Sequence, residues 1–134
     1  MSGNLYKFKN IMVIDDNNID LYIASKVISK NNFAENIATY SSAVEALEFL
    51  VSNEDDPSVL PEIILVDIYM PVMSGFEFMN AYDGLSQKVK EHCKAYIVSS
   101  TIDENDISRT QQDKNVVAFQ EKPLTAEFLS NIKM

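Results

Sequence analysis

Three short apolar runs constrain what this chain can fold into more than any other feature. They cover residues 11–14, 63–66 and 95–98, and none of them alternates with polar side chains. Strands of this kind are buried on both faces, which is typical of a parallel sheet covered by helices on both sides. Residues 34–40 and 116–119 predict two weaker strands. The sequence therefore favours a sheet of five strands.

Segments with helical patterns separate these strands. Residues 18–31 carry Ile19, Ile23 and Val27 at a spacing of four, which predicts one apolar helix face. Capping-box spacing predicts two further helices, one after Ser42 and one after Ser74. A polar run over 103–112 predicts an exposed helix, and apolar spacing within 124–132 predicts a last one. Residues 87–93 fit either a further turn of helix or a long loop.

Strands that alternate with helices predict an α/β fold with a doubly wound parallel sheet. Right-handed crossovers leave only a few strand orders for such a sheet. Ligands of these folds bind beyond the carboxyl ends of the strands. The residues that follow each strand are therefore the first candidates for a functional site.

The charge balance and the length of the apolar runs exclude several classes of protein. The 134 residues suffice for one domain, and 20 acidic against 11 basic residues give a formal charge of −9. This charge disfavours direct contact with nucleic acid or an anionic membrane. The first nine residues lack the apolar core of a signal peptide, and no apolar run approaches the length of a membrane span. We expect a soluble, cytoplasmic protein without membrane insertion.

The lone cysteine and the lone histidine are adjacent in the sequence. Cys93 has no partner for an internal disulfide, which fits a reducing compartment. With His92 as the single histidine, a zinc site is not expected. Both residues are expected near a helix surface, without a function.

Polar side chains follow four of the predicted strands. They are Asp15 and Asp16, Asp67, Ser99 and Lys122. The sheet would bring three carboxylates, a hydroxyl and an ammonium to one edge. Two ionised carboxylates about 4 Å apart cost roughly 4 kcal/mol at an effective dielectric constant near 20. Mg²⁺ would relieve that repulsion, and a carboxylate beside a cation, a lysine and a hydroxyl suits phosphoryl transfer.

These motifs resemble those of the response-regulator receiver family of two-component signalling. The resemblance rests on Asp15-Asp16, on LVDIYMPVMSG over 65–75, on Ser99-Ser100 and on Lys122-Pro123, in the same order along nearly the whole chain. It implies a flavodoxin-like, CheY-like (βα)5 fold with strand order 2-1-3-4-5. It also implies one receiver domain over 1–134, with a core of about 9–132 and no output domain.

The resemblance assigns a chemical role to each strand-end residue. Asp67 is expected to accept the phosphoryl group, with Lys122 as its ammonium partner. Asp15, Asp16 and Asp67 are expected to bind Mg²⁺, together with the backbone carbonyl of Tyr69. Standing alone, Asp15 or Asp16 would equally fit a helix N-cap.

Two further residues resemble the switch of this family. Ser99 corresponds to the hydroxyl residue that turns toward the phosphoryl oxygens, and Phe119 to the aromatic residue of the fifth strand. Plain core packing of Phe119 stays open, because a buried aromatic need not move. The chain departs from the family pattern at 113–116, where a glycine is usual. The Lys122–Pro123 bond is often cis in the family.

The resulting hypothesis is a phosphorylation-dependent switch rather than an enzyme acting on a separate substrate. A histidine kinase or a histidine phosphotransfer protein would phosphorylate Asp67. The surface of the fourth strand, fourth helix and fifth strand would then control an unknown protein partner. The chain is expected to be a monomer or a weak dimer. A phosphorelay intermediate and the receiver piece of a hybrid kinase remain alternatives.

Two other classes of protein are less favoured. A dehalogenase-type phosphatase needs a general acid two residues after its nucleophilic aspartate, and that position holds Tyr69. A phosphorylation-independent interaction module would have little need for the complete acidic pocket.

Overall fold

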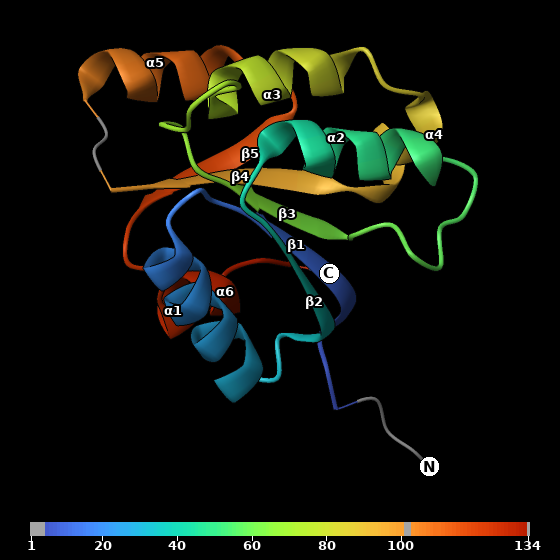
Figure 1. The fold of residues 1–134 in the computed structure, drawn as a ribbon. Helices are drawn as coiled ribbons and strands as arrows, with labels where there is room; N and C mark the ends of the chain where they lie inside the picture. Colours follow the sequence, from blue (N-terminus) through green and yellow to red (C-terminus); the bar gives the residue numbers. More distant parts are fainter. Residues whose placement is uncertain (1–4, 101–102, 134) are drawn as a thin grey trace.

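The computed structural model describes residues 5–100 and 103–133, in which strands and helices alternate (Figure 1). The strands are β1 (Phe8–Ile14), β2 (Ala34–Tyr40), β3 (Ile63–Val66), β4 (Lys94–Ser99) and β5 (Val116–Glu121). The helices are α1 (Asn18–Lys30), α2 (Ala43–Ser52), α3 (Gly75–Asp83), α4 (Gln87–His92), α5 (Glu104–Gln112) and α6 (Ala126–Ser130). Thr101 and Ile102, which follow the fourth strand, lie outside the described residues.

The strands form one parallel sheet in the order β2-β1-β3-β4-β5. The predicted fold class and strand order are therefore confirmed. Ile14 at the end of β1 is paired with Val66 at the end of β3, and Val66 with Ile97 of β4. This register aligns the carboxyl ends of the central strands at one edge of the sheet.

Helices cover both faces of the sheet. Helices α2, α3, α4 and α5 lie on one face, and α1 and α6 lie on the other (Figure 1). Neighbouring residues of a strand enter opposite cores: Ile64 and Val66 join the core under α2 and α3, whereas Ile63 and Leu65 join the core under α1 and α6. The absence of polar alternation in the apolar runs follows from this arrangement.

Helix α4 resolves the segment that the sequence left open. Ser86 caps it by accepting a hydrogen bond from the Val89 backbone N–H, and the Val89 side chain is fully buried. The described residues thus contain six helices rather than the five expected, and the helix that follows β4 is α5. The surface position expected for Cys93 is wrong, because its side chain is buried at the end of α4.

The apolar face predicted for α1 is also wrong. Leu21, Ala24 and Ile28 are buried against the sheet, whereas Ile19 is 70% exposed. The inward face contains a small residue, Ala24, which weakens its apolar signal in the sequence. No helix of residues 5–100 and 103–133 is long and apolar enough to cross a bilayer.

Candidate functional site

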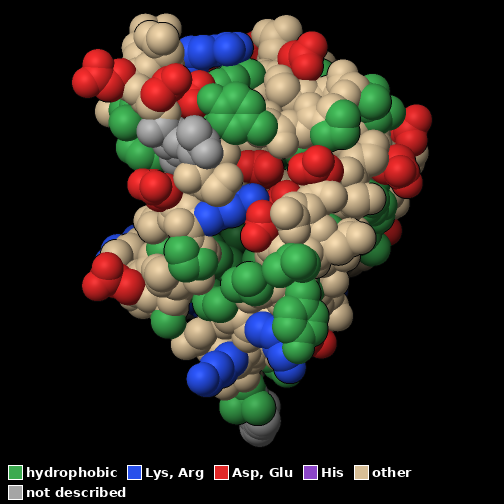
Figure 2. Space-filling model, turned by 60° about the vertical axis from the view of Figure 1, so that its left-hand side comes forward, with side chains coloured by type: hydrophobic (Ala, Val, Ile, Leu, Met, Phe, Trp, Pro, Cys, Tyr) green, Lys and Arg blue, Asp and Glu red, His purple; other side chains and the backbone are tan. Residues whose placement is uncertain are grey.

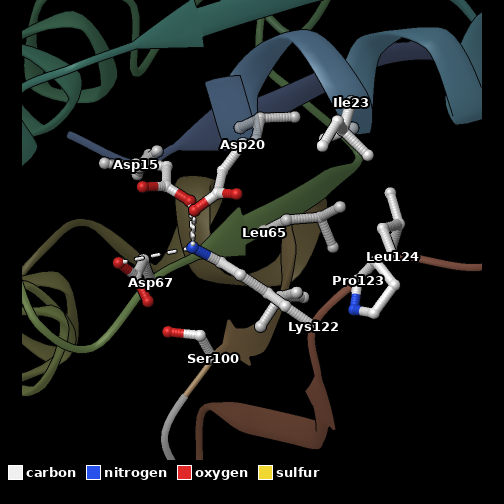
Figure 3. Close-up of a pocket in the computed structure, with 13 residues that line it drawn as sticks. Asp15, Asp20, Ile23, Leu65, Asp67, Ser100, Lys122, Pro123 and Leu124 are labelled. Carbon is white, nitrogen blue, oxygen red and sulfur yellow. Dashed lines mark hydrogen bonds and ion pairs between the residues drawn. The ribbon is translucent and has the colours of Figure 1, made fainter. Parts of the chain in front are cut away.

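Backbone pairing brings the predicted strand-end residues together. The Asp67 N–H donates to Ile14 O at 3.0 Å, so Asp67 lies beside the end of β1, where Asp15 follows. The Lys122 N–H donates to Ser99 O at 2.9 Å, which aligns the end of β5 with that of β4. The side chains of Asp15 and Asp67 extend toward the Lys122 ammonium (Figure 3). The predicted convergence at the sheet edge is therefore present.

The three predicted carboxylates form one cluster. Asp15, Asp16 and Asp67 each offer an oxygen within 4.8 Å of the others; Asp15 and Asp67 are buried and Asp16 is exposed. Asp67 Oδ1 is buried and accepts no hydrogen bond from the described residues. Hard oxygen ligands with an unsatisfied buried lone pair fit a divalent cation such as Mg²⁺.

Neither Asp15 nor Asp16 caps α1. The N-cap is Asn17, whose Oδ1 accepts hydrogen bonds from the backbone N–H groups of Ile19 at 2.9 Å and Asp20 at 3.1 Å. Asp15 Oδ1 accepts the Asn17 N–H at 2.9 Å, which orients its carboxylate. Asn17 supplies the capping interaction and leaves the acidic pair directed toward the site.

Lys122 lies among three carboxylates. Its Nζ is 2.5 Å from Asp15 Oδ2, 2.8 Å from Asp20 Oδ2 and 3.7 Å from Asp67 Oδ2. The Asp20 contact is a charge-assisted hydrogen bond, whereas the Asp15 and Asp67 contacts are ion pairs, the first short and the second beyond hydrogen-bond distance. The ammonium is thus held closer to β1 and α1 than to Asp67.

The environment shifts the pKa of both central groups upward. Burial raises the pKa of Asp67, and the charge of Asp15 adds to this, while the nearby Ser99 hydroxyl and Lys122 act in the opposite direction. For Lys122, burial alone lowers the pKa, but the hydrogen bonds to Asp15 and Asp20 outweigh it and the net pKa is raised. Lys122 is therefore a stable cation beside a carboxylate that is costly to ionise.

The motif over 65–75 ends at Gly75, and close packing explains why this position holds a glycine. A Cβ atom at residue 75 would lie 2.2 Å from the backbone oxygen of Asp67. The Gly75 N–H donates to Ile68 O at 2.7 Å, which holds the start of α3 against the end of β3. Any side chain here would displace the backbone that carries Asp67.

The two predicted switch residues lie on neighbouring strands. Ser99 is fully buried, and its hydroxyl makes no hydrogen bond of normal geometry with the described residues. Phe119 is partly buried and packs against the core under α2 and α3. The Lys122–Pro123 bond is cis. Whether Phe119 moves stays a prediction.

Nearly the whole chain matches one known protein family. The model of the family described as "Response regulator receiver domain" matches residues 11–132. The chain belongs to the response regulator receiver family.

Similar proteins of this family come from plants and bacteria. The Two-component response regulator ORR1 of Oryza sativa is 26% identical over 127 residues, which cover 92% of this chain and 53% of that protein. Probable histidine kinase 4 of the same species is 33% identical over 88 residues, which cover 62% of this chain and 8% of that protein. A Two component response regulator from Cytophaga hutchinsonii has a TM-score of 0.86 at 27% identity, with 93% of each chain covered. The receiver spans about half of the ORR1 regulator's length.

Two contacts of this receiver were not predicted from the sequence. Asp20 pairs with Lys122, and Asp106 of α5 accepts a hydrogen bond from the Tyr69 hydroxyl at 2.5 Å. Each acid lies in the first turn of a helix, a position where the helix dipole favours any acidic side chain. No sequence signal distinguished them from other first-turn acids. The metal role of the Tyr69 backbone carbonyl stays a prediction.

A cavity of about 260 Å³ opens beside the receiver's acidic cluster. Apolar side chains of β1, α1 and β3 line it, and Asp20, Asp67, Ser100 and Lys122 lie at its polar end. Figure 2 shows acidic side chains gathered around a basic one, with a hollow and apolar side chains below them. The acidic cluster therefore borders a cavity.

Proposed function

We propose that this receiver is a phosphorylation-dependent signalling switch in which Asp67 accepts a phosphoryl group from a phosphohistidine. The observation that carries the proposal is the state of the Asp67 carboxylate. It is buried, one oxygen has no hydrogen-bond partner among the described residues, and an ammonium lies 3.7 Å from the other. A buried carboxylate of this kind is available as a nucleophile next to a group that neutralises developing charge.

The transfer exchanges one bond to phosphorus for another. An oxygen of Asp67 attacks the phosphorus of the phosphohistidine, and a phosphorus–oxygen bond forms while the phosphorus–nitrogen bond breaks. The imidazole leaves with the bonding electron pair and takes up a proton. Hydrolysis resets the switch: a water oxygen attacks the phosphorus, the acyl phosphate bond breaks, and Asp67 and inorganic phosphate are released. Lys122 stabilises the phosphoryl oxygens throughout.

The acidic cluster supports a cation-dependent reaction. Asp15, Asp16 and Asp67 would hold Mg²⁺, with the Tyr69 backbone carbonyl as a further ligand in the proposal. The bound ion would neutralise negative charge on the phosphoryl oxygens. If so, Asp16→Asn should weaken Mg²⁺ binding. A phosphorylation-independent interaction module would have no need to bind Mg²⁺.

The output of the switch would pass through the elements around Ser99. Its buried hydroxyl has no normal hydrogen bond to the described residues, so it is available to a phosphoryl oxygen on Asp67. A shift of β4 toward Asp67 would then alter α5 and the packing of Phe119 on β5. The surface formed by β4, α5 and β5 is the proposed contact for a downstream protein.

The phosphoryl donor would be a histidine kinase or a histidine phosphotransfer protein. The similarity to part of a probable histidine kinase supports the alternative that this sequence serves as the receiver of a hybrid kinase or a relay. A dehalogenase-type phosphatase is disfavoured, because the side chain two residues after Asp67 is Tyr69, whose hydroxyl is directed to Asp106.

Labelling with acetyl phosphate tests the proposal. We expect the wild type to incorporate phosphate in the presence of Mg²⁺ and Asp67→Asn to incorporate none. Asp55→Asn is the matched control, because Asp55 is an exposed acid paired with Lys88. Equal labelling of wild type and Asp67→Asn would contradict the proposal, as would an unlabelled wild type with both acetyl phosphate and a phosphorylated histidine donor.

A further inference from the structure

Asp20 of α1 accepts a hydrogen bond from the Lys122 ammonium. Its Oδ2 lies 2.8 Å from Nζ, whereas Oδ2 of Asp67 is 3.7 Å away. Figure 3 shows Asp20 reaching from α1 across the pocket toward Lys122. The two residues are 102 positions apart in the sequence, so this contact links the first helix to the end of β5.

We propose that Asp20 is a positioning residue that holds the Lys122 ammonium away from Asp67 until a phosphoryl group competes for it. The inference rests on the proposed function of Asp67. In the unphosphorylated receiver, the carboxylates of Asp15 and Asp20 contact Nζ on the side that faces β1 and α1. The phosphoryl group must then attract the ammonium away from Asp20.

The geometry of an ammonium group supports this competition. Lys122 has three N–H donors, but with Nζ held 2.5 Å from Asp15 and 2.8 Å from Asp20 the remaining donor lies too far from Asp67, at 3.7 Å, to form a hydrogen bond. The Lys122 side chain is 13% exposed and that of Asp20 is 31% exposed, so water screens the Asp20 pair more than a fully buried one. The Asp20 contact is therefore the one that can be exchanged at low cost.

Helix α1 fixes Asp20 for this role. Asn17 accepts the Asp20 backbone N–H at 3.1 Å and so anchors the first turn. The Asp20 carboxylate does not complete a capping box with Asn17 among the described contacts; it extends to Lys122 instead. A first-turn acid that served the helix dipole alone would have no need of this partner.

Binding of beryllofluoride with Mg²⁺, a phosphoryl analogue, tests the inference in the whole chain. Asp20→Asn should bind the analogue about fivefold more tightly, the upper value for a partly exposed ion pair that no longer competes. Asp20→Glu keeps the charge and should restore nearly wild-type affinity. Glu127→Gln is the matched control, because it removes an exposed first-turn acid from α6.

A Lys122→Met background separates positioning from a general charge effect. The gain from Asp20→Asn should vanish there, because no ammonium remains to be released. A gain that persists in this background would overturn the inference, and so would unchanged or weaker binding by Asp20→Asn in the wild-type background.

A crystal structure of unphosphorylated Asp20→Asn tests the same inference without the analogue. Lys122 Nζ should move to within hydrogen-bond distance of Asp67. An ammonium that stays 3.7 Å away would overturn the positioning role. A wild type that fails to bind beryllofluoride would contradict the proposed function instead, and this structure would still decide the role of Asp20.

Discussion

The Tyr69 hydroxyl donates a 2.5 Å hydrogen bond to Asp106 Oδ2, which joins the loop after β3 to the first turn of α5. Asp106 also completes the capping box of α5 with Asp103. Tyr69 is two residues from Asp67, and α5 follows the strand that ends at Ser99. The contact therefore couples the proposed acceptor loop to the helix expected to respond to it.

Removal of this hydroxyl should loosen the coupling. Tyr69→Phe is expected to lower the free energy of unfolding by about 1 kcal/mol, a modest loss because the side chain is 52% exposed. Urea denaturation followed by circular dichroism measures it. Tyr22→Phe, at another exposed tyrosine, is the control and should leave the midpoint unchanged. Equal midpoints for Tyr69→Phe and the wild type would show that the hydrogen bond adds no stability.

The raised pKa of Asp67 predicts a pH-dependent gain in stability from Asp67→Asn. Burial, followed by the charge of Asp15, raises the pKa of Asp67 above its ordinary value of 3.8. The stability contributed by protonated Asp67 is fully present when the pH lies below the pKa that Asp67 has in the unfolded chain. It is lost as the pH rises through the pKa that Asp67 has in the folded protein. Asp67→Asn avoids this loss, and Lys122 keeps Asp15 and Asp20 as partners.

Asp67→Asn should therefore be more stable than the wild type at pH 7, by on the order of 1 kcal/mol. The difference should shrink as the pH falls below the unfolded pKa. Urea titrations at several pH values measure it. The prediction would be wrong if Asp67→Asn were less stable than the wild type at pH 7, or if its gain in unfolding free energy grew toward acid pH.

Backbone strain at Val72 predicts a stabilising substitution. Val72 has φ = 67° and its side chain is 94% exposed, so the left-handed conformation gains no compensating packing. A β-branched residue there costs about 1–2 kcal/mol, and glycine costs about 0.5–1 kcal/mol through chain entropy. Val72→Gly should thus raise the free energy of unfolding by about 0.5–1 kcal/mol.

Val51→Gly is the matched control for that measurement. Val51 is also an exposed valine, but it lies in the regular helix α2, where glycine is expected to cost roughly 0.5 kcal/mol relative to valine. Urea midpoints of opposite sign for the two variants would support the strain argument. Destabilisation by both would refute it.

Cys93 should be inert in the folded receiver. Burial raises the pKa of its thiol to about 12, although a hydrogen bond with Tyr82 acts in the opposite direction. The nucleophilic thiolate is then scarce at pH 8 and sterically protected. Ellman's reagent should react slowly in native buffer and fast in urea. Rapid stoichiometric reaction of the folded protein would contradict the buried position.

The sequence predicted the sheet edge well and the long-range acidic contacts poorly. Asp15, Asp67 and Lys122 follow apolar or β-rich segments, and parallel pairing brings such strand ends together whatever the helices do. The partners of Asp20 and Asp106 depend instead on how helices pack against the sheet. Their contacts span 102 and 37 residues, distances over which local patterns carry no information.

The orientation of α1 illustrates the same limit. Two overlapping stripes compete on this helix, and the more hydrophobic one, which contains Ile19 and Ile23, is not the one buried most deeply. Ala24 lies on the inward face, where a small side chain allows close approach to the sheet. Periodicity located the helix, but the choice of face required the tertiary packing.

Chemical identification of the phosphorylated residue tests the central claim most directly. Borohydride reduces an acyl phosphate to an alcohol, so an aspartyl phosphate at Asp67 becomes homoserine. After treatment with acetyl phosphate and Mg²⁺, peptide mass spectrometry should find homoserine at position 67 and at no other aspartate. Homoserine at another aspartate, with position 67 unchanged, would contradict the assignment of Asp67 as the acceptor.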